Sequence, residues 1–222
     1  MRGRTYKKAF TLAELVLAIA ITSVVGLSVA TVASALANAH RHTDTMKESI
    51  QSGRSAMIHV GSMVRKAKLL VAKSTDALAI WTGDANGDAA INVDELVLIR
   101  YVPEARTVES EQVAFPETMP HDIVVALNET KSLVEVDTAG EVSDAINSAT
   151  LAEYRSGRVL ASDVRSFSIQ VDVDPPYARL VLIRITVGPP DQQIALTSSV
   201  RLRADAVDNV VTYEGVPVLD LD

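Results

Sequence analysis

The residues best suited to chemistry lie in one short acidic stretch, from Asp84 to Glu95. A calcium-binding loop of twelve residues has oxygen ligands at positions 1, 3, 5, 7, 9 and 12, the seventh through its backbone carbonyl. Counted from Asp84, these positions hold Asp84, Asn86, Asp88, Ala90, Asn92 and Glu95. A hard cation needs several oxygens that converge within one tight loop, so this spacing predicts a calcium site. A solvated acidic turn that binds no metal is the alternative.

The stretch resembles a single calcium loop of the EF-hand type, and its order of Asn-Gly-Asp and Ile-Asn resembles the repeat of cellulosomal dockerins. Position 6 holds Ala89 where such loops have Gly, and a left-handed Ala costs roughly 1–2 kcal/mol. Dockerins use two repeats and this chain has one, so their binding function is not carried over. We expect calcium to stabilise a domain that has no cysteine and therefore no disulfide.

Short β-rich runs surround the acidic loop and must position it. Asp76–Trp81 before the loop reads as a strand, whereas Leu96–Tyr101 after it fits a strand or a helix, and we favour a strand. Strands are predicted at residues 77–81, 96–102, 106–113, 122–127, 133–137, 164–173, 179–187 and 193–203. A short helix can form at about 144–154. Prolines in the two turns between the last three runs predict an antiparallel series.

A second feature is an apolar run from Phe10 to Ala39, in which Glu14 is the only charge. As a helix, residues 15–39 are long enough to span about 30 Å of hydrocarbon. A charge within a bilayer costs roughly 2.5–3.5 kcal/mol, so Glu14 points to a contact with protein. The cations before the run predict a cytoplasmic N-terminus by the positive-inside rule, and they are Arg2, Arg4, Lys7 and Lys8.

This arrangement resembles the class III signal of type IV pilins and type II secretion pseudopilins: a short basic leader, then Phe10, Thr11, Leu12 and Glu14. The resemblance implies that a prepilin peptidase cuts between Ala9 and Phe10 and methylates the new amine. It also implies that Glu14 pairs with the terminal amine of a neighbouring subunit during assembly. The family usually has Gly before the cut, and with Ala9 we expect cleavage that is less efficient.

A conventional signal peptide is the competing interpretation of the same segment. Ala35-Leu36-Ala37 is a small-residue sequence of the kind that signal peptidase cuts after. A plain membrane anchor or a removed signal therefore stays open as an alternative to the pilin-like anchor. Against this alternative, a charge such as Glu14, five residues after the cut that prepilin peptidase would make, is unusual in an ordinary signal core.

A stripe of apolar and small residues continues the helical pattern beyond the membrane segment. Its members are spaced alternately by four and three residues, which keeps them on one face of a helix. They are Met46, Ile50, Gly53, Met57, Val60, Val64, Ala67 and Val71. The pattern predicts one helix from about Phe10 to Val71. The expected organisation is a leader at 1–9, a transmembrane helix at 10–39, its amphipathic continuation at 40–73 and a β-rich head at 74–222.

The predicted fold class is α+β, with the long N-terminal helix packed against an antiparallel sheet as in pilins. Within the head, Val164–Val171 and the strand that begins at Arg179 resemble the C-terminal sheet of J-type minor pseudopilins and W-type minor pilins. Alternating apolar strands occur in many sheets, so another antiparallel head is the alternative for this subfamily.

Composition narrows the classes of function. The formal charge is −7 and becomes more negative without the basic leader, which argues against general nucleic-acid binding. We find no Ser/His/Asp or Cys/His arrangement for nucleophilic catalysis, no zinc-protease motif and no phosphate loop, so we expect that the protein is not an enzyme.

The function expected from these patterns is that of a minor pseudopilin or minor pilin, a structural subunit of a type II secretion or type IV pilus filament, at its tip. The expected partners are prepilin peptidase, other major and minor pseudopilins or pilins, and the inner membrane, with the head periplasmic or extracytoplasmic. A membrane-anchored calcium-binding adhesion or scaffold module that never polymerises is the alternative.

Overall fold

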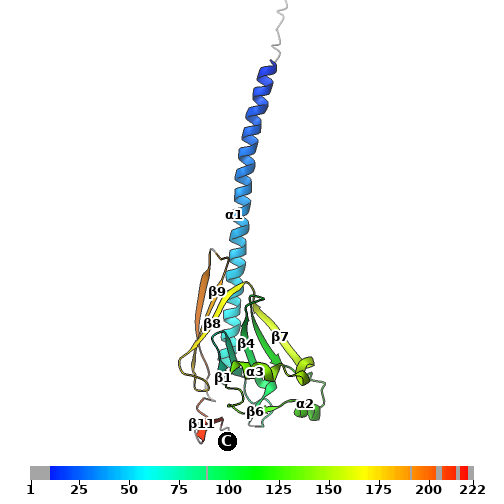
Figure 1. Cartoon of the computed structure of the whole chain (residues 1–222), viewed down its shortest axis with the longest axis vertical. Helices are drawn as coiled ribbons and strands as arrows, with labels where there is room; N and C mark the ends of the chain where they lie inside the picture. Colours follow the sequence, from blue (N-terminus) through cyan, green and yellow to red (C-terminus); the bar gives the residue numbers. More distant parts are fainter. Residues whose placement is uncertain (1–10, 89, 191, 204–206, 214–215, 220–222) are drawn as a thin grey trace, which may run out of the picture. The chain divides into compact units, whose positions relative to one another are not determined.

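The computed structural model describes residues 11–88, 90–190, 192–203, 207–213 and 216–219. The chain divides into two compact units, Met1–Thr45 and Met46–Asp222. The helix α1 (Leu12–Lys66) runs through the boundary between them (Figure 1). The predicted processing residues Ala9 and Phe10, and Ala89 of the acidic loop, lie outside the described residues.

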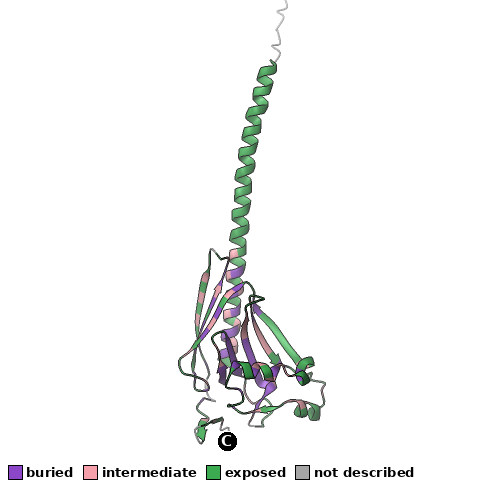
Figure 2. Cartoon of the chain, viewed as in Figure 1, coloured by how far each residue is buried: buried purple, intermediate pink, exposed green. Residues whose placement is uncertain are grey.

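The described part of the first unit is the apolar half of α1, and its residues are exposed (Figure 2). An 18-residue window of α1 has a mean hydropathy of 2.4, so the helix is long and apolar enough to cross a membrane. Its hydroxyl groups bond to the helix itself: Thr22 Oγ1 donates to Ala18 O at 2.7 Å, and Ser23 Oγ donates to Ile19 O at 2.8 Å. Because these hydroxyl groups bond within the helix, the surface of residues 15–39 is mostly hydrocarbon.

The second unit contains the rest of α1 and all of the strands. Six residues of α1 are buried here: Ser49, Gly53, Ala56, Val60, Gly61 and Val64. Gly53, Val60 and Val64 belong to the predicted stripe, whereas Met46, Ile50 and Met57 of that stripe are half-buried. The predicted end of the helix at Val71 is wrong, because α1 ends at Lys66 and β1 (Leu69–Lys73) follows. The strand residues 69–72 are buried on both faces, so they form a continuous apolar run without the alternation that marks a half-buried strand.

Two antiparallel sheets form the framework of this unit. The five-stranded sheet has the order β1-β2-β4-β5-β7, and its remaining strands are β2 (Ala77–Trp81), β4 (Leu96–Val102), β5 (Thr107–Val113) and β7 (Arg155–Ala161). The three-stranded sheet has the order β10-β9-β8, with β8 (Val164–Val171), β9 (Leu180–Val187) and β10 (Ile194–Arg201). Two short ribbons pair β3 (Ile91–Asn92) with β6 (Thr130–Lys131) and β11 (Val210–Tyr213) with β12 (Val216–Leu219).

Two hydrophobic cores lie on opposite faces of the five-stranded sheet, because alternate residues of a strand point to opposite faces. In β2, Leu78 and Ile80 join the core shared with α1 and the three-stranded sheet. Ala77, Ala79 and Trp81 join the other core, which includes α3 (Ala139–Ile146). The fold is therefore α+β with antiparallel sheets, as predicted.

Several predicted elements of the head differ from the observed ones. The predicted strand at 122–127 is the helix α2 (His121–Leu127), and residues 133–137 form turns instead of a strand. A short apolar run does not reveal its period, and Pro120 directly before α2 favours a helix start. The helix expected at 144–154 is two elements, α3 and the 3-10 helix η2 (Ala149–Tyr154). Strand β7 was not predicted, because five of its residues are exposed and show no alternation.

Candidate functional site: the acidic loop and the first helical turn

The acidic loop joins β2 to β4, which confirms that a strand precedes it and a strand follows it. Between them lie β3 and a single 3-10 turn, η1 (Val93–Glu95). Gly87 has a φ of 76°, a left-handed value that a residue without Cβ adopts at no steric cost. The loop therefore turns sharply at position 4 of the predicted calcium pattern.

Side chains at positions 1, 3 and 5 organise this turn by accepting backbone N–H groups. Asp84 Oδ1 accepts from Gly87 N at 2.7 Å and from Asp88 N at 3.1 Å. Asn86 Oδ1 accepts from Asp88 N at 3.0 Å, and Asp88 Oδ1 accepts from Ala90 N at 2.9 Å. These are Asx-type turns, in which a short polar side chain replaces a backbone acceptor.

Asp88 is also the acceptor for two side-chain amides. Its Oδ2 accepts from Asn92 Nδ2 and from Asn86 Nδ2, each at 2.9 Å. The hydrogen bond from Asn92 is the largest influence and lowers the pKa of Asp88; slight burial opposes it, and Asn86 and the Ala90 N–H lower the pKa further. Asp88 is therefore held as a carboxylate at the centre of the turn.

Glu95, the last predicted ligand, lies in the core and is only 3% exposed. Its Oε1 accepts from Ala85 N at 2.6 Å, and its Oε2 accepts from Trp81 Nε1 at 2.9 Å and from Asn92 N at 3.2 Å. Both oxygens thus have N–H partners, as a buried carboxylate requires. Glu95 ties the start of the loop to the strand before it and caps η1.

The predicted ligands are therefore brought together only in part. Asp84, Asn86, Asp88 and Asn92 surround one turn, whereas Glu95 is directed toward Trp81 in the core. Within the described ranges, no group of three or more His, Cys, Asp or Glu side chains is arranged to hold a metal ion.

Sequence reasoning missed the partners that attach the loop to the rest of the head. Asn128 Nδ2 donates to Asp94 Oδ1 at 2.8 Å, and Asp94 N donates to Asn128 Oδ1 at 3.2 Å. Thr130 Oγ1 donates to Asn92 Oδ1 at 3.3 Å. No local signal marks these contacts, because the partners are more than thirty residues apart in the chain.

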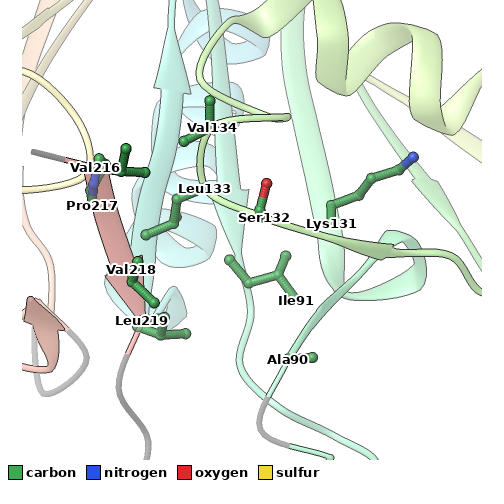
Figure 3. Close-up of a pocket in the computed structure, with 10 residues that line it drawn as sticks. All are labelled: Ala90, Ile91, Lys131, Ser132, Leu133, Val134, Val216, Pro217, Val218 and Leu219. Atoms are coloured by element: carbon green, nitrogen blue, oxygen red, sulfur yellow. The ribbon is translucent and has the colours of Figure 1, made fainter. Parts of the chain in front are cut away.

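A small apolar cavity of about 230 Å³ lies beside the loop (Figure 3). Ile91 forms one part of its wall, Leu133 and Val134 form another, and Val216 and Val218 of β12 form a third. Of the predicted metal ligands its lining contains Ala90, and its polar side chains are Lys131 and Ser132.

At the start of α1, Glu14 forms a capping box with Thr11. Glu14 Oε2 accepts from Thr11 N at 3.0 Å and from Thr11 Oγ1 at 2.9 Å, and Glu14 N donates to Thr11 Oγ1 at 3.3 Å. These bonds satisfy N–H groups that the first helical turn leaves without a partner. The signal was present in the sequence, since Thr-x-x-Glu before an apolar run is the pattern of a capping box.

Comparison of the chain with models of protein families, with curated proteins and with solved structures gives no match.

Proposed function

We propose that this chain is a minor pseudopilin or minor pilin, a non-catalytic subunit of a type II secretion or type IV pilus filament. In this proposal prepilin peptidase cuts it between Ala9 and Phe10, and the apolar half of α1 stays in the inner membrane until assembly. The head is then periplasmic, and related subunits pack beside it at the filament tip.

One observation carries the proposal: a single helix whose first part is apolar and exposed and whose second part is buried by two sheets. Residues 12–44 of α1 are exposed, whereas Ala56, Val60 and Val64 are fully buried. An apolar helix surface of this length needs lipid or other helices around it. Membrane insertion followed by packing in a filament supplies both.

Glu14 supports assembly as well as capping. Both donors of Thr11 bond to the same oxygen, Oε2. None of the described residues donates a hydrogen bond to Glu14 Oε1, so this oxygen is in a position to accept from the amine of a neighbouring subunit. Such a pair would offset the cost of a carboxylate in hydrocarbon.

Two substitutions separate these roles. Glu14→Gln keeps an oxygen that can accept from Thr11 but removes the charge, because Gln also serves in a capping box. Thr11→Ala removes the cap but keeps the charge. We expect Glu14→Gln to abolish incorporation into filaments or tip complexes, and Thr11→Ala to reduce it only slightly. Glu48→Gln, an exposed position on the same helix, is the matched control.

The assay is the amount of full-length protein recovered in sheared filaments or in detergent-extracted complexes with other pilin-like subunits. Normal incorporation of Glu14→Gln would contradict the assembly role and favour a membrane-anchored module that never polymerises.

The mass of the mature protein tests processing independently. A chain that begins at N-methylated Phe10 supports the proposal. A chain that begins after Ala37 contradicts it, because the apolar half of α1 would then be a removed signal.

We also propose that residues 84–95 bind calcium after export. Support comes from Asp84, Asn86 and Asp88, whose side-chain oxygens surround one turn. Because Glu95 is buried and directed toward Trp81, we expect the first three positions to dominate. Calcium should raise the melting temperature of the full chain in detergent relative to chelator, and Asp84→Asn should abolish the increase. No increase, or the same increase in Asp84→Asn, would contradict calcium binding.

A further inference from the structure

Strand β7 is an exposed edge of the five-stranded sheet. Among the residues that the structure describes, β5 is its one strand partner, and residues 155–159 are exposed. Val159, which pairs with Glu109 of β5, is 56% exposed. An edge strand of this kind presents unpaired N–H and C=O groups to solvent.

The register shows which backbone groups point outward. Ala114 N donates to Tyr154 O at 2.9 Å, one step along the same ladder that pairs Val113 with Arg155. Hydrogen-bonded pairs alternate along an antiparallel ladder, so Ser156 and Arg158 bond to β5. Arg155, Gly157 and Val159 therefore direct their backbone groups away from the sheet.

The charged side chains of strand β7 itself are all positive, in an acidic protein. The chain has a formal charge of −7, yet β7 contains Arg155 and Arg158 and no acidic residue. Arg155 is three residues from Arg158, so the two side chains leave opposite faces of the strand.

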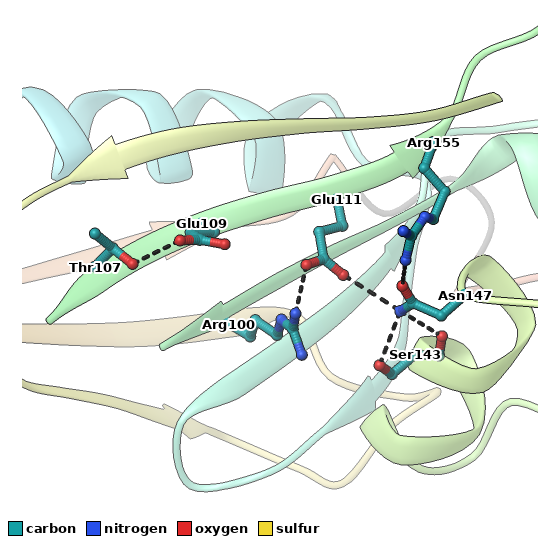
Figure 4. Close-up of polar contacts among 7 residues, drawn as sticks. All are labelled: Arg100, Thr107, Glu109, Glu111, Ser143, Asn147 and Arg155. Atoms are coloured by element: carbon teal, nitrogen blue, oxygen red, sulfur yellow. Dashed lines mark hydrogen bonds and ion pairs between the residues drawn. The ribbon is translucent and has the colours of Figure 1, made fainter. Parts of the chain in front are cut away.

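A polar hollow of about 270 Å³ lies beside the edge on the face that carries Arg155. Glu111 and Asn147 line it together with β7 residues 155–157. Figure 4 shows the polar contacts that Glu111, Asn147 and Arg155 make beside it. Glu111 is the acid in the hollow, and Arg100 Nη2 pairs with its Oε1 at 2.6 Å. Arg155 donates to Asn147 Oδ1, which orients its guanidinium along the hollow. With Glu111 neutralised by Arg100, the remaining charge is that of Arg155.

We propose that β7 binds an extended acidic segment of a partner protein as an added strand. The outward groups of Gly157 and Val159 would pair with the backbone of the segment. Two of its carboxylates, three residues apart, would meet Arg155 in the hollow and Arg158 on the opposite face. Strand addition obtains affinity from backbone hydrogen bonds and specificity from pockets for side chains, and this edge has both.

A labelled peptide tests the proposal on the full chain in detergent micelles, by fluorescence anisotropy. The probe is acetyl-Val-Thr-Glu-Val-Thr-Glu-Val-Thr-amide, and its control has Lys in place of both Glu residues. We expect the Glu peptide to bind at least tenfold more tightly than the Lys peptide. Equal binding of the two peptides, or no binding of either, would overturn the proposal, and the arginines would then serve only to protect an open edge from aggregation.

Two sets of variants test the two parts of the site. Val159→Pro removes one outward N–H and leaves the ladder with β5 intact, since Pro is tolerated on edge strands. Val159→Pro should weaken binding of the Glu peptide at least tenfold, whereas Val159→Thr should leave this binding unchanged. The double variant Arg155→Ser and Arg158→Ser should remove the preference for the Glu peptide over the Lys peptide. If Val159→Pro fails to fold, this double variant still tests the proposal. A preference that survives this double variant contradicts the proposal. Peptide binding does not require filament assembly, so these results are independent of the Glu14 experiments.

Discussion

The carboxylate of Glu95 accepts a hydrogen bond from the indole Nε1 of Trp81 at 2.9 Å, and both residues are at most 3% exposed. The same carboxylate accepts from the backbone at Ala85 and Asn92. One buried side chain therefore closes the acidic loop against the strand that precedes it.

Removing the Glu95 carboxylate should destabilise the head strongly. Glu95→Ala leaves three N–H donors without an acceptor and opens a cavity, so we expect a loss of about 3 kcal/mol in the free energy of unfolding. Trp81→Phe removes one donor and should cost about 1–2 kcal/mol. Urea unfolding of the full chain in detergent measures both, and a double-mutant cycle gives the coupling between the two side chains. Additive effects would show that this hydrogen bond contributes little.

The acidic turn should resist mild acid. Because the pKa of Asp88 is lowered in the fold, its stabilising effect is present above the pKa of the unfolded chain. The effect is lost only as the pH falls through the lower pKa of the folded state. Asn92→Ala removes the hydrogen bond that contributes most to lowering the pKa of Asp88. The pKa should then rise toward its usual range, as NMR titration of the Asp88 carboxyl carbon would show. Thr130→Val removes only the hydroxyl contact to Asn92 and should leave the titration unchanged.

Near neutral pH, Asp137→Asn should stabilise the start of α3. Thr138 and Glu141 form the capping box of this helix. A hydrogen bond to Glu141, loss of hydration and the charge of Glu141 raise the pKa of Asp137, so its ionised form is disfavoured in the fold.

The raised pKa of Asp137 determines how stability changes with pH. Stability should fall as the pH rises through the unfolded and then the raised folded pKa of Asp137, and Asp137→Asn removes this fall. The melting temperatures of the variant and the parent should differ at pH 7 and converge at low pH. A constant difference at every pH would contradict the explanation.

Gly53 of α1 should tolerate no side chain, although Ala is the better helix former by about 1 kcal/mol. A Cβ at Gly53 would lie 2.8 Å from Leu196 Cδ1 and 3.1 Å from Val187 Cγ1. We therefore expect Gly53→Ala to lower the free energy of unfolding by about 1 kcal/mol, because the overlap with the three-stranded sheet outweighs the gain in propensity.

Gly61→Ala is the matched control on the same helix. Its nearest neighbour would be Val200 Cγ2 at 3.3 Å, so we expect a change of less than about 0.5 kcal/mol. Urea unfolding of the full chain in detergent measures both variants. A stabilising Gly53→Ala would show that Leu196 moves aside at little cost.

Long-period patterns were read correctly from the sequence, whereas short apolar runs were not. Of the predicted stripe, Gly53, Val60 and Val64 are buried in α1, and Met46, Ile50 and Met57 are half-buried. The run in Asp122–Leu127 is a helix instead of a strand, and residues 69–73 form a strand where helix was expected. A run of four or five apolar residues fits either period, so its neighbours in space decide between them.

What the sequence determined by itself is therefore local: the helix of α1, its apolar half, and the strands on each side of the acidic loop. Each depends on spacings within a few turns or one strand. Only the tertiary structure decided that Glu95 faces Trp81 in the core, that Asn128 holds Asp94, and that β7 forms an open edge. Those outcomes depend on pairings between residues far apart in the chain, and a buried carboxylate takes whichever N–H donors the packed strands bring to it.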